Sequence, residues 1–156
     1  MHPMVARIPA LLLAALMMHN ASPAAAQTAP PPIRYTVSFP EPHTHYVEVT
    51  AVVPTDGRPE VELMMAVWTP GSYLVREYAR NVEEVTAASQ DGRALQVDKV
   101  DKNRWRVATG DAPSVEVRYR VYAREMSVRT NWVETDFAML NGAPTFMTLA
   151  DGEDPD

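Results

Sequence analysis

Histidine and cysteine are the side chains that most often build metal sites, and this chain has four histidines and no cysteine. A zinc hydrolase needs two histidines one helical turn apart with a glutamate beside the first, but His2 and His19 lie near the N-terminus, and neither His43 nor His45 is followed by glutamate. His43 and His45 form an H-x-H pair at the start of a predicted strand, where both side chains would point to one face. Zinc takes at least three protein ligands, and the third would have to be a distant carboxylate such as Glu41. We therefore expect no catalytic residue, no metal site and no cofactor in this chain.

The segment from Trp68 to Asn81, which reads W-T-P-G-S-Y-L-V-R-E-Y-A-R-N, is the other part of the sequence that could do chemistry. An apolar strand runs into a Pro-Gly turn, and aromatic residues mixed with arginines and a glutamate follow. Such groups on a turn beside a sheet are suited to recognition. The alternative is that the aromatic residues cap the domain while the charged residues form surface ion pairs of little energetic value. The candidate residues for docking of a substrate or a domain are Trp68, Tyr73, Arg76, Glu77, Tyr78 and Arg80.

The elements that must position these residues are strands, because apolar residues recur with a period of two. The alternation runs through 35–39, 47–53, 61–67 and 115–123, and the last of these has an arginine-rich opposite face. The turn formers around Asp56 and Gly57 predict a hairpin between the second and third strands. We find no helical stripe, and residues 74–81 could form a turn or two at most. The pattern predicts an all-β fold, an antiparallel β-sandwich of short strands.

The N-terminus predicts export. A single arginine, an apolar run from Ile8 to Met18 that is too short to span a bilayer, and alanines at 24 and 26 are typical of a cleavable signal peptide over residues 1–26. A Pro-rich linker at 27–32, a β-sandwich domain at 33–149 and an acidic tail at 150–156 then follow. We expect a protein of the bacterial periplasm or a secreted protein, with no membrane contact after signal cleavage.

The net charge of the chain limits the classes of molecule that it is expected to bind. The chain carries 14 basic and 20 acidic residues, a net charge of −6. Removal of Arg7 with the signal peptide gives 13 − 20 = −7. Nucleic acid is therefore not an expected partner. Without cysteine, disulfides cannot support the fold, which must depend on apolar burial.

Several motifs in the same order resemble the N-terminal domain of the glycyl aminopeptidase family of zinc metallopeptidases, the sixty-first metallopeptidase family. The segment from Trp68 to Asn81 resembles that family's signature stretch. The opening strands at 35–53, the strand K-N-R-W-R-V at 102–107 and the Y-x-V-Y-A stretch within 117–131 are similar as well. The resemblance extends from about Tyr35 to Phe146.

The resemblance implies a non-catalytic, cleft-shaping accessory domain. In the family it precedes a catalytic domain that carries the zinc, often with a PDZ domain after it, so zinc is expected only there. The chain ends about where that catalytic domain would begin, so we expect a truncated or split form whose partner is a separately encoded catalytic domain or a peptide. The alternative is a free-standing exported β-sandwich module that binds protein or carbohydrate.

Apolar residues near the C-terminus leave two interpretations open. Either a catalytic domain covers them, or they complete the core of this domain as a final strand, because apolar alternation does not say which surface a strand meets. These residues are Trp132, Phe137, Met139, Leu140, Phe146 and Met147.

Overall fold

The computed structural model of the protein describes residues 31–150. The predicted signal peptide lies outside the described residues, as do most of the predicted linker and of the acidic tail. Within the described range, no helix is long and apolar enough to cross a membrane.

The secondary structure of the described residues consists of short strands and two 3-10 helices. The strands are β1 (Arg34–Ser38), β2 (Tyr46–Pro54), β3 (Glu60–Met64), β4 (Val82–Ser89), β5 (Ala94–Leu95), β6 (Val97–Asp101), β7 (Arg104–Ala108), β8 (Ser114–Tyr122), β9 (Trp132–Val133), β10 (Ala138–Met139) and β11 (Thr148–Leu149). The helices are η1 (Pro42–Thr44) and η2 (Tyr78–Asn81). The second helix falls within the stretch for which the sequence allowed a turn or two.

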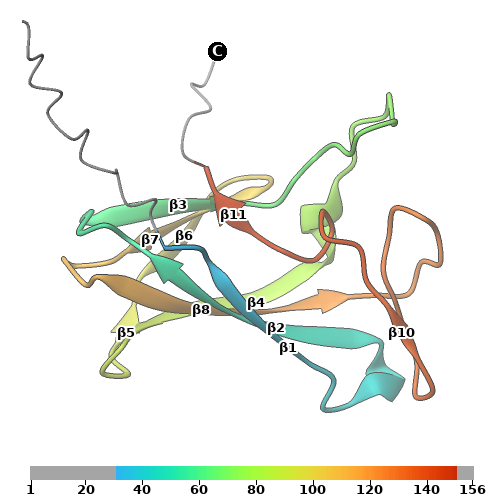
Figure 1. The fold of residues 1–156 in the computed structure, drawn as a ribbon, viewed down its shortest axis with the longest axis horizontal. Coiled ribbons are helices and arrows are strands. Elements are labelled where there is room, and N and C mark those ends of the chain that lie inside the picture. Colours follow the sequence, from blue (N-terminus) through green and yellow to red (C-terminus); the bar gives the residue numbers. More distant parts are fainter. Residues whose placement is uncertain (1–30, 151–156) are drawn as a thin grey trace, which may run out of the picture.

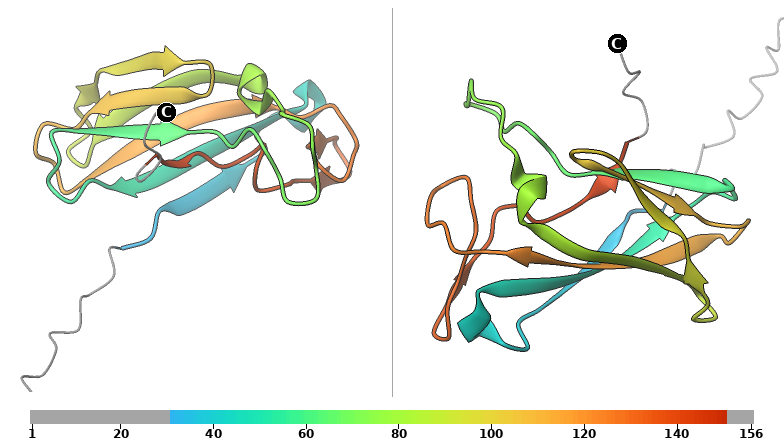
Figure 2. Two further views of the ribbon diagram at one scale, coloured as in Figure 1. Left: turned by 90° about the horizontal axis from the view of Figure 1, so that it is seen from above. Right: turned by 180° about the vertical axis from the view of Figure 1, so that it is seen from behind.

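Two antiparallel sheets form the body of the fold, and they lie in two layers (Figures 1 and 2). One sheet has the strand order β1-β2-β8-β4-β5, and the other has the order β11-β3-β7-β6. A separate pair, β9 with β10, lies at one end. The prediction of an all-β, antiparallel fold is confirmed.

The core lies between the two sheets and follows from the alternation along the strands. In β2 and β8, every second side chain is buried, and the two strands pair over their whole lengths, with Val49 opposite Tyr119. Leu63 and Trp105 are paired buried residues of the other sheet. Each sheet therefore turns one apolar face toward the other, and this burial is the main stabilising contribution to the fold.

The other face of β8 is charged and is neutralised by its neighbours. Arg120 lies 2.9 Å from both Glu83 and Glu84 of β4, and Arg118 lies 2.7 Å from Glu116. The ion pairs lie largely in solvent, so they contribute little to stability. The predicted arginine-rich solvent face is confirmed.

The predicted hairpin between the second and third strands is wrong. The turn is present, with Asp56 and Gly57 in the left-handed region at φ 53° and 72°. However, β2 pairs with β1 and β8, whereas β3 pairs with β7 and β11, so the turn carries the chain from one sheet to the other. Turn residues determine where the chain reverses, but they do not determine which strands pair. Each of the two strands buries its apolar face against the opposite layer, so they can belong to different sheets.

Some of the apolar residues near the C-terminus complete the core of this domain, and at least one of them stays exposed. Met147 is buried, and Phe146 packs against Tyr35 with ring centroids 4.7 Å apart, so these residues complete the core of this domain. The strand that follows them, β11, pairs with β3. Phe137 is 52% exposed, so it contributes no comparable burial.

Candidate docking groove

The loop that connects β3 with η2 projects from the body of the sandwich (Figures 1 and 2). We call residues 66–77 the finger. At its tip, Ser72 donates a backbone hydrogen bond of 3.1 Å to the carbonyl of Thr69, and Gly71 has φ 78°, a conformation that favours glycine. The indole N–H of Trp68 donates to the carbonyl of Ser72. Hydrogen bonds within the finger therefore stabilise the turn at its tip.

The base of the finger is closed by one further backbone bond. The N–H of Arg76 donates to the carbonyl of Val67 over 2.8 Å. Next to it, the N–H of Met65 bonds to the carbonyl of Asn103 over 2.9 Å, and the side-chain amide of Asn103 donates back to Met65 over 2.8 Å. The two sides of the finger are therefore joined at their base, and the residue before the finger is bonded to the turn that precedes β7.

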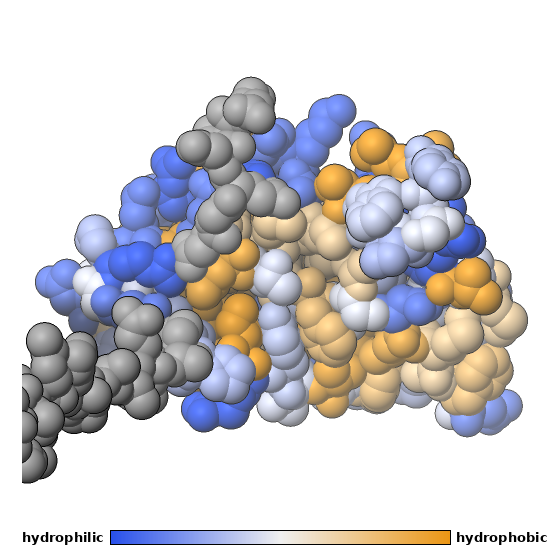
Figure 3. All heavy atoms as spheres, turned by 45° about the horizontal axis from the view of Figure 1, so that its top comes forward, coloured by the Kyte–Doolittle hydropathy of each residue, from blue (hydrophilic) through white to orange (hydrophobic). Residues whose placement is uncertain are grey.

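Apolar side chains cover the outer part of the finger. Tyr73 is fully exposed, and Trp68, Leu74 and Val75 are 53%, 60% and 71% exposed. In the space-filling view, separate apolar groups lie at the upper right, away from the apolar band across the middle of the face (Figure 3). Adjacent exposed apolar side chains of this kind make the finger a candidate surface for binding another molecule.

The six predicted docking residues fall into two groups. Trp68 and Tyr73 lie on the exposed part of the finger, whereas Arg76, Glu77, Tyr78 and Arg80 lie at its base. The structure therefore brings the last four together and leaves Trp68 and Tyr73 apart from them. Tyr78 is only 4% exposed, so its ring belongs to the core, and the residue reaches the surface only where it lines a groove at the base of the finger.

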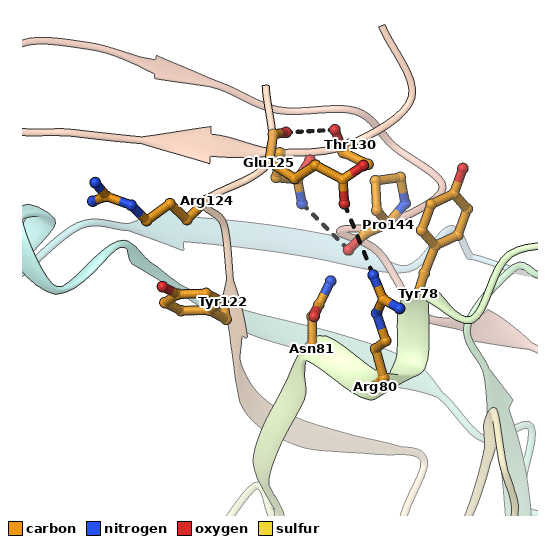
Figure 4. Close-up of a pocket in the computed structure, with 9 residues that line it drawn as sticks. Tyr78, Arg80, Asn81, Tyr122, Arg124, Glu125, Thr130 and Pro144 are labelled. Carbon is orange, nitrogen blue, oxygen red and sulfur yellow. Dashed lines mark hydrogen bonds and ion pairs between the residues drawn. The ribbon is translucent and has the colours of Figure 1, made fainter. Parts of the chain in front are cut away.

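The base of the finger borders a groove of about 440 Å³. This volume is within the range of roughly 300–1,000 Å³ that is usual for ligand sites. A smaller hollow of about 170 Å³ adjoins it and shares part of its lining (Figure 4). We call the two together the base groove. The residues common to both hollows are Tyr78, Arg80, Asn81, Glu125 and Thr130.

Two ion pairs hold charges of the groove in place. Arg80 lies 3.9 Å from Glu125, and this pair connects η2 with the loop after β8 (Figure 4). Glu77, which lines the larger hollow, lies 3.7 Å from Lys102, which lines neither hollow. Arg76 forms no ion pair with another described residue.

The far wall of the groove was not predicted from the sequence. Asn131 is buried, and its amide donates to the hydroxyl of Thr145 over 2.9 Å and accepts from the N–H of Asn141 over 2.8 Å. The hydroxyl of Thr130 donates to the carbonyl of Glu125. These residues are 47 to 67 positions away from Tyr78 in the sequence, and no pattern in the sequence connects them with it.

The expectation that both histidines lie on one face of a strand is wrong. His43 lies in η1, and His45 follows it in the left-handed region at φ 65°, so both precede β2. The ring of His45 bonds through Nδ1 to the carbonyl of Val133 over 2.7 Å and contacts Arg124 through Nε2. Among residues 31–150, no group of three histidine, aspartate, glutamate or cysteine side chains could hold a metal ion. The described residues therefore offer no site for zinc.

Comparison with known proteins places most of the chain in one family. Residues 34–155 match the family described as the Peptidase M61 N-terminal domain. The crystal structure of an aminopeptidase N family protein from Idiomarina loihiensis is similar, with a TM-score of 0.69 and 29% identity over 76% of this chain. The match covers only 20% of the Idiomarina chain. Among curated proteins, none matches this sequence.

Proposed function

The chain belongs to the family of Peptidase M61 N-terminal domains, and on this basis we propose that it serves as the non-catalytic accessory domain of a glycyl aminopeptidase-like zinc peptidase. In this role the sandwich packs on a catalytic domain and forms one wall of its substrate cleft. The partner supplies the zinc and the catalytic residues. We also propose that the protein acts after export, as its N-terminal sequence predicts.

The exposed finger is the observation that supports this role most directly. Tyr73, Leu74 and Val75 are large apolar side chains that the domain leaves in water, although the finger itself is anchored by backbone hydrogen bonds. Burial of apolar area is worth about 25 cal/mol per Å², so a partner that covers these side chains gains affinity from them. In the Idiomarina protein, four-fifths of the chain lies outside the match, so that chain has further polypeptide that could pack on the equivalent surface.

A chimaera with the Idiomarina protein tests the proposal. Residues 34–150 replace the corresponding segment of that protein, and hydrolysis of aminoacyl p-nitroanilides by the chimaera is measured. We expect the triple variant Tyr73→Ser, Leu74→Ser, Val75→Ser to lower kcat/KM at least fivefold. The matched control is Phe39→Ser with Val100→Ser, which removes exposed apolar side chains elsewhere.

Binding in trans is measured in parallel. The purified chain is mixed with the Idiomarina protein that lacks the corresponding segment, and association is followed by size-exclusion chromatography. An accessory domain predicts a complex that the triple variant weakens and the control variant preserves. If both variants behave alike in both assays, the finger is not a docking surface, and a glycan and peptide array then tests the free-standing binding module.

A further inference from the structure

Two hydrogen-bond donors at the base of the finger have no partner within the described chain. The hydroxyl of Tyr78 is buried without a hydrogen bond, and so is Nε of Arg76. Buried polar groups are nearly always satisfied, and an unsatisfied one costs about 1–3 kcal/mol. The two groups belong to residues two positions apart that line the same groove, so they are donors available to a molecule bound there.

The charge of the groove points to the chemistry of that molecule. Glu77 and Glu125 each have a basic partner, Lys102 and Arg80. The guanidinium of Arg76 is the charge that remains without a counter-ion among the residues that line the larger hollow. A guanidinium and a phenol are donors, and a carboxylate is the acceptor that suits both, because charge-assisted hydrogen bonds are about twice as strong as neutral ones.

The remaining lining favours a peptide as the carrier of this carboxylate. Leu74 and Val75 give the groove an apolar wall beside Arg76. The side chain of Asn81 lines both hollows and forms no hydrogen bond with another described residue, so its amide can donate and accept, as a peptide backbone requires. An apolar wall next to a few convergent polar groups is typical of a ligand site.

We propose that the base groove binds a peptide through a carboxylate held by Arg76 and Tyr78, with a neighbouring apolar side chain on Leu74 and Val75. The carboxylate is either the C-terminus of the peptide or an acidic side chain. The choice of a peptide, rather than another carboxylate, rests on the proposed function; the carboxylate itself rests on the two unpartnered donors.

A peptide library tests this site on the purified chain alone. Fluorescein-labelled hexapeptide pools with one fixed residue are made with a free or an amidated C-terminus, and binding is measured by fluorescence polarisation. Loss of binding on amidation identifies the C-terminal carboxylate. Selection of aspartate or glutamate pools that bind equally well when amidated identifies an acidic side chain.

Two conservative variants test whether the peptide binds in the groove. Tyr78→Phe removes only the hydroxyl, and Arg76→Gln removes the charge. We expect each to weaken the best pool at least tenfold, because a hydrogen bond to a charged group is lost. The matched controls, Tyr73→Phe and Arg34→Gln, change exposed residues outside the groove and leave the affinity within twofold.

The outcomes separate this inference from the proposed function. If no pool binds, if neutral amidated pools bind as tightly as acidic or free ones, or if Tyr78→Phe and Arg76→Gln bind like the controls, the carboxylate site is overturned. The triple variant of the chimaera assay also changes Leu74 and Val75, which line the groove. Tyr73→Ser alone, at a residue that lines neither hollow, is therefore the chimaera variant that tests the finger independently of the groove. Conversely, if the groove binds the peptide but the finger variant has the same activity as its control, the carboxylate site is supported and the docking role of the finger is rejected.

Discussion

The hydroxyl of Tyr119 donates a buried hydrogen bond of 2.9 Å to the carbonyl oxygen of Thr145. The same hydroxyl accepts a bond of 3.1 Å from the N–H of Met147. Tyr119 lies in the middle of β8, whereas the other two residues belong to the segment before β11. One phenol therefore ties the C-terminal segment to the central strand and satisfies two backbone groups that the core would otherwise leave unpaired.

Replacement of Tyr119 by phenylalanine should lower the free energy of unfolding by about 1–3 kcal/mol, because a buried carbonyl and a buried N–H each lose their partner. Urea denaturation followed by circular dichroism measures the change. A variant within about 0.5 kcal/mol of the wild type would show that water replaces the hydroxyl.

The same substitution at Tyr78 should have the opposite effect on stability. Its hydroxyl is buried without a partner, so Tyr78→Phe removes an unsatisfied group and keeps the ring in the core. We expect the free energy of unfolding to stay the same or to rise, by up to about 1 kcal/mol. The two phenylalanine variants, compared in one denaturation experiment, serve as controls for each other. A loss at Tyr78 as large as that at Tyr119 would mean that its hydroxyl has a partner within the chain.

Alkaline pH should destabilise the protein through Tyr119. Burial raises the pKa of its hydroxyl well above the ordinary value of 10.0, and burial also raises the pKa of Tyr35. Above pH 10 the unfolded state loses a proton that the folded state keeps, so the free energy of unfolding falls as pH rises, and the contribution is fully present only below pH 10. Denaturation between pH 8 and about 11 should show a shallower decline for Tyr119→Phe than for the wild type. Equal slopes would exclude Tyr119 as the source.

Removal of the buried amide of Asn131 should lower the free energy of unfolding more than removal of an exposed amide. Asn131→Ala breaks its bonds to Thr145 and Asn141 and should cost about 2–3 kcal/mol. The control is Gln96→Ala, whose amide bonds to Asp98 in solvent, and which should change stability by less than about 0.5 kcal/mol. Thermal and urea unfolding of the two variants measure the difference. Similar small effects would show that the wall of the base groove does not depend on this network.

Serine substitutions in the finger should leave the fold intact. Leu74 and Val75 are 60% and 71% exposed, so the double variant Leu74→Ser, Val75→Ser should change the free energy of unfolding by less than about 0.5 kcal/mol. Val117, which is fully buried in β8, provides the contrast: Val117→Ala should cost about 2 kcal/mol. A large loss in the finger variant, seen in the same urea titrations, would mean that these side chains support the domain.

Strand positions and the polarity of their faces could be predicted from the sequence. In β8, valine and tyrosine alternate with glutamate and arginine. The structure buries Val115, Val117, Tyr119 and Val121, exposes Arg118 and leaves Glu116 and Arg120 half-buried. Alternation is a local property with a period of two, so it can be read without knowledge of the partner strand. The same reasoning located the finger, because a Pro-Gly turn after an apolar strand is also a local signal.

Strand partners and the site lining depended on the tertiary structure. The turn at Asp56 and Gly57 suggested pairing of β2 with β3, but each strand joins a different sheet, because alternation reports that a face is buried and not what covers it. Likewise, the sequence could not show that Tyr78 is buried, while Tyr73, five positions earlier, is fully exposed.

The amino-acid sequence by itself determined that this protein is built of antiparallel strands around an apolar core and carries an aromatic, charged turn between two of them. Only the tertiary structure decided that the base of this turn meets the loop after β8, where Glu125 and Asn131 complete a groove. The physical reason is that residues distant in the chain come together only through packing of the whole core, and the sequence records each local preference without the arrangement that satisfies all of them at once.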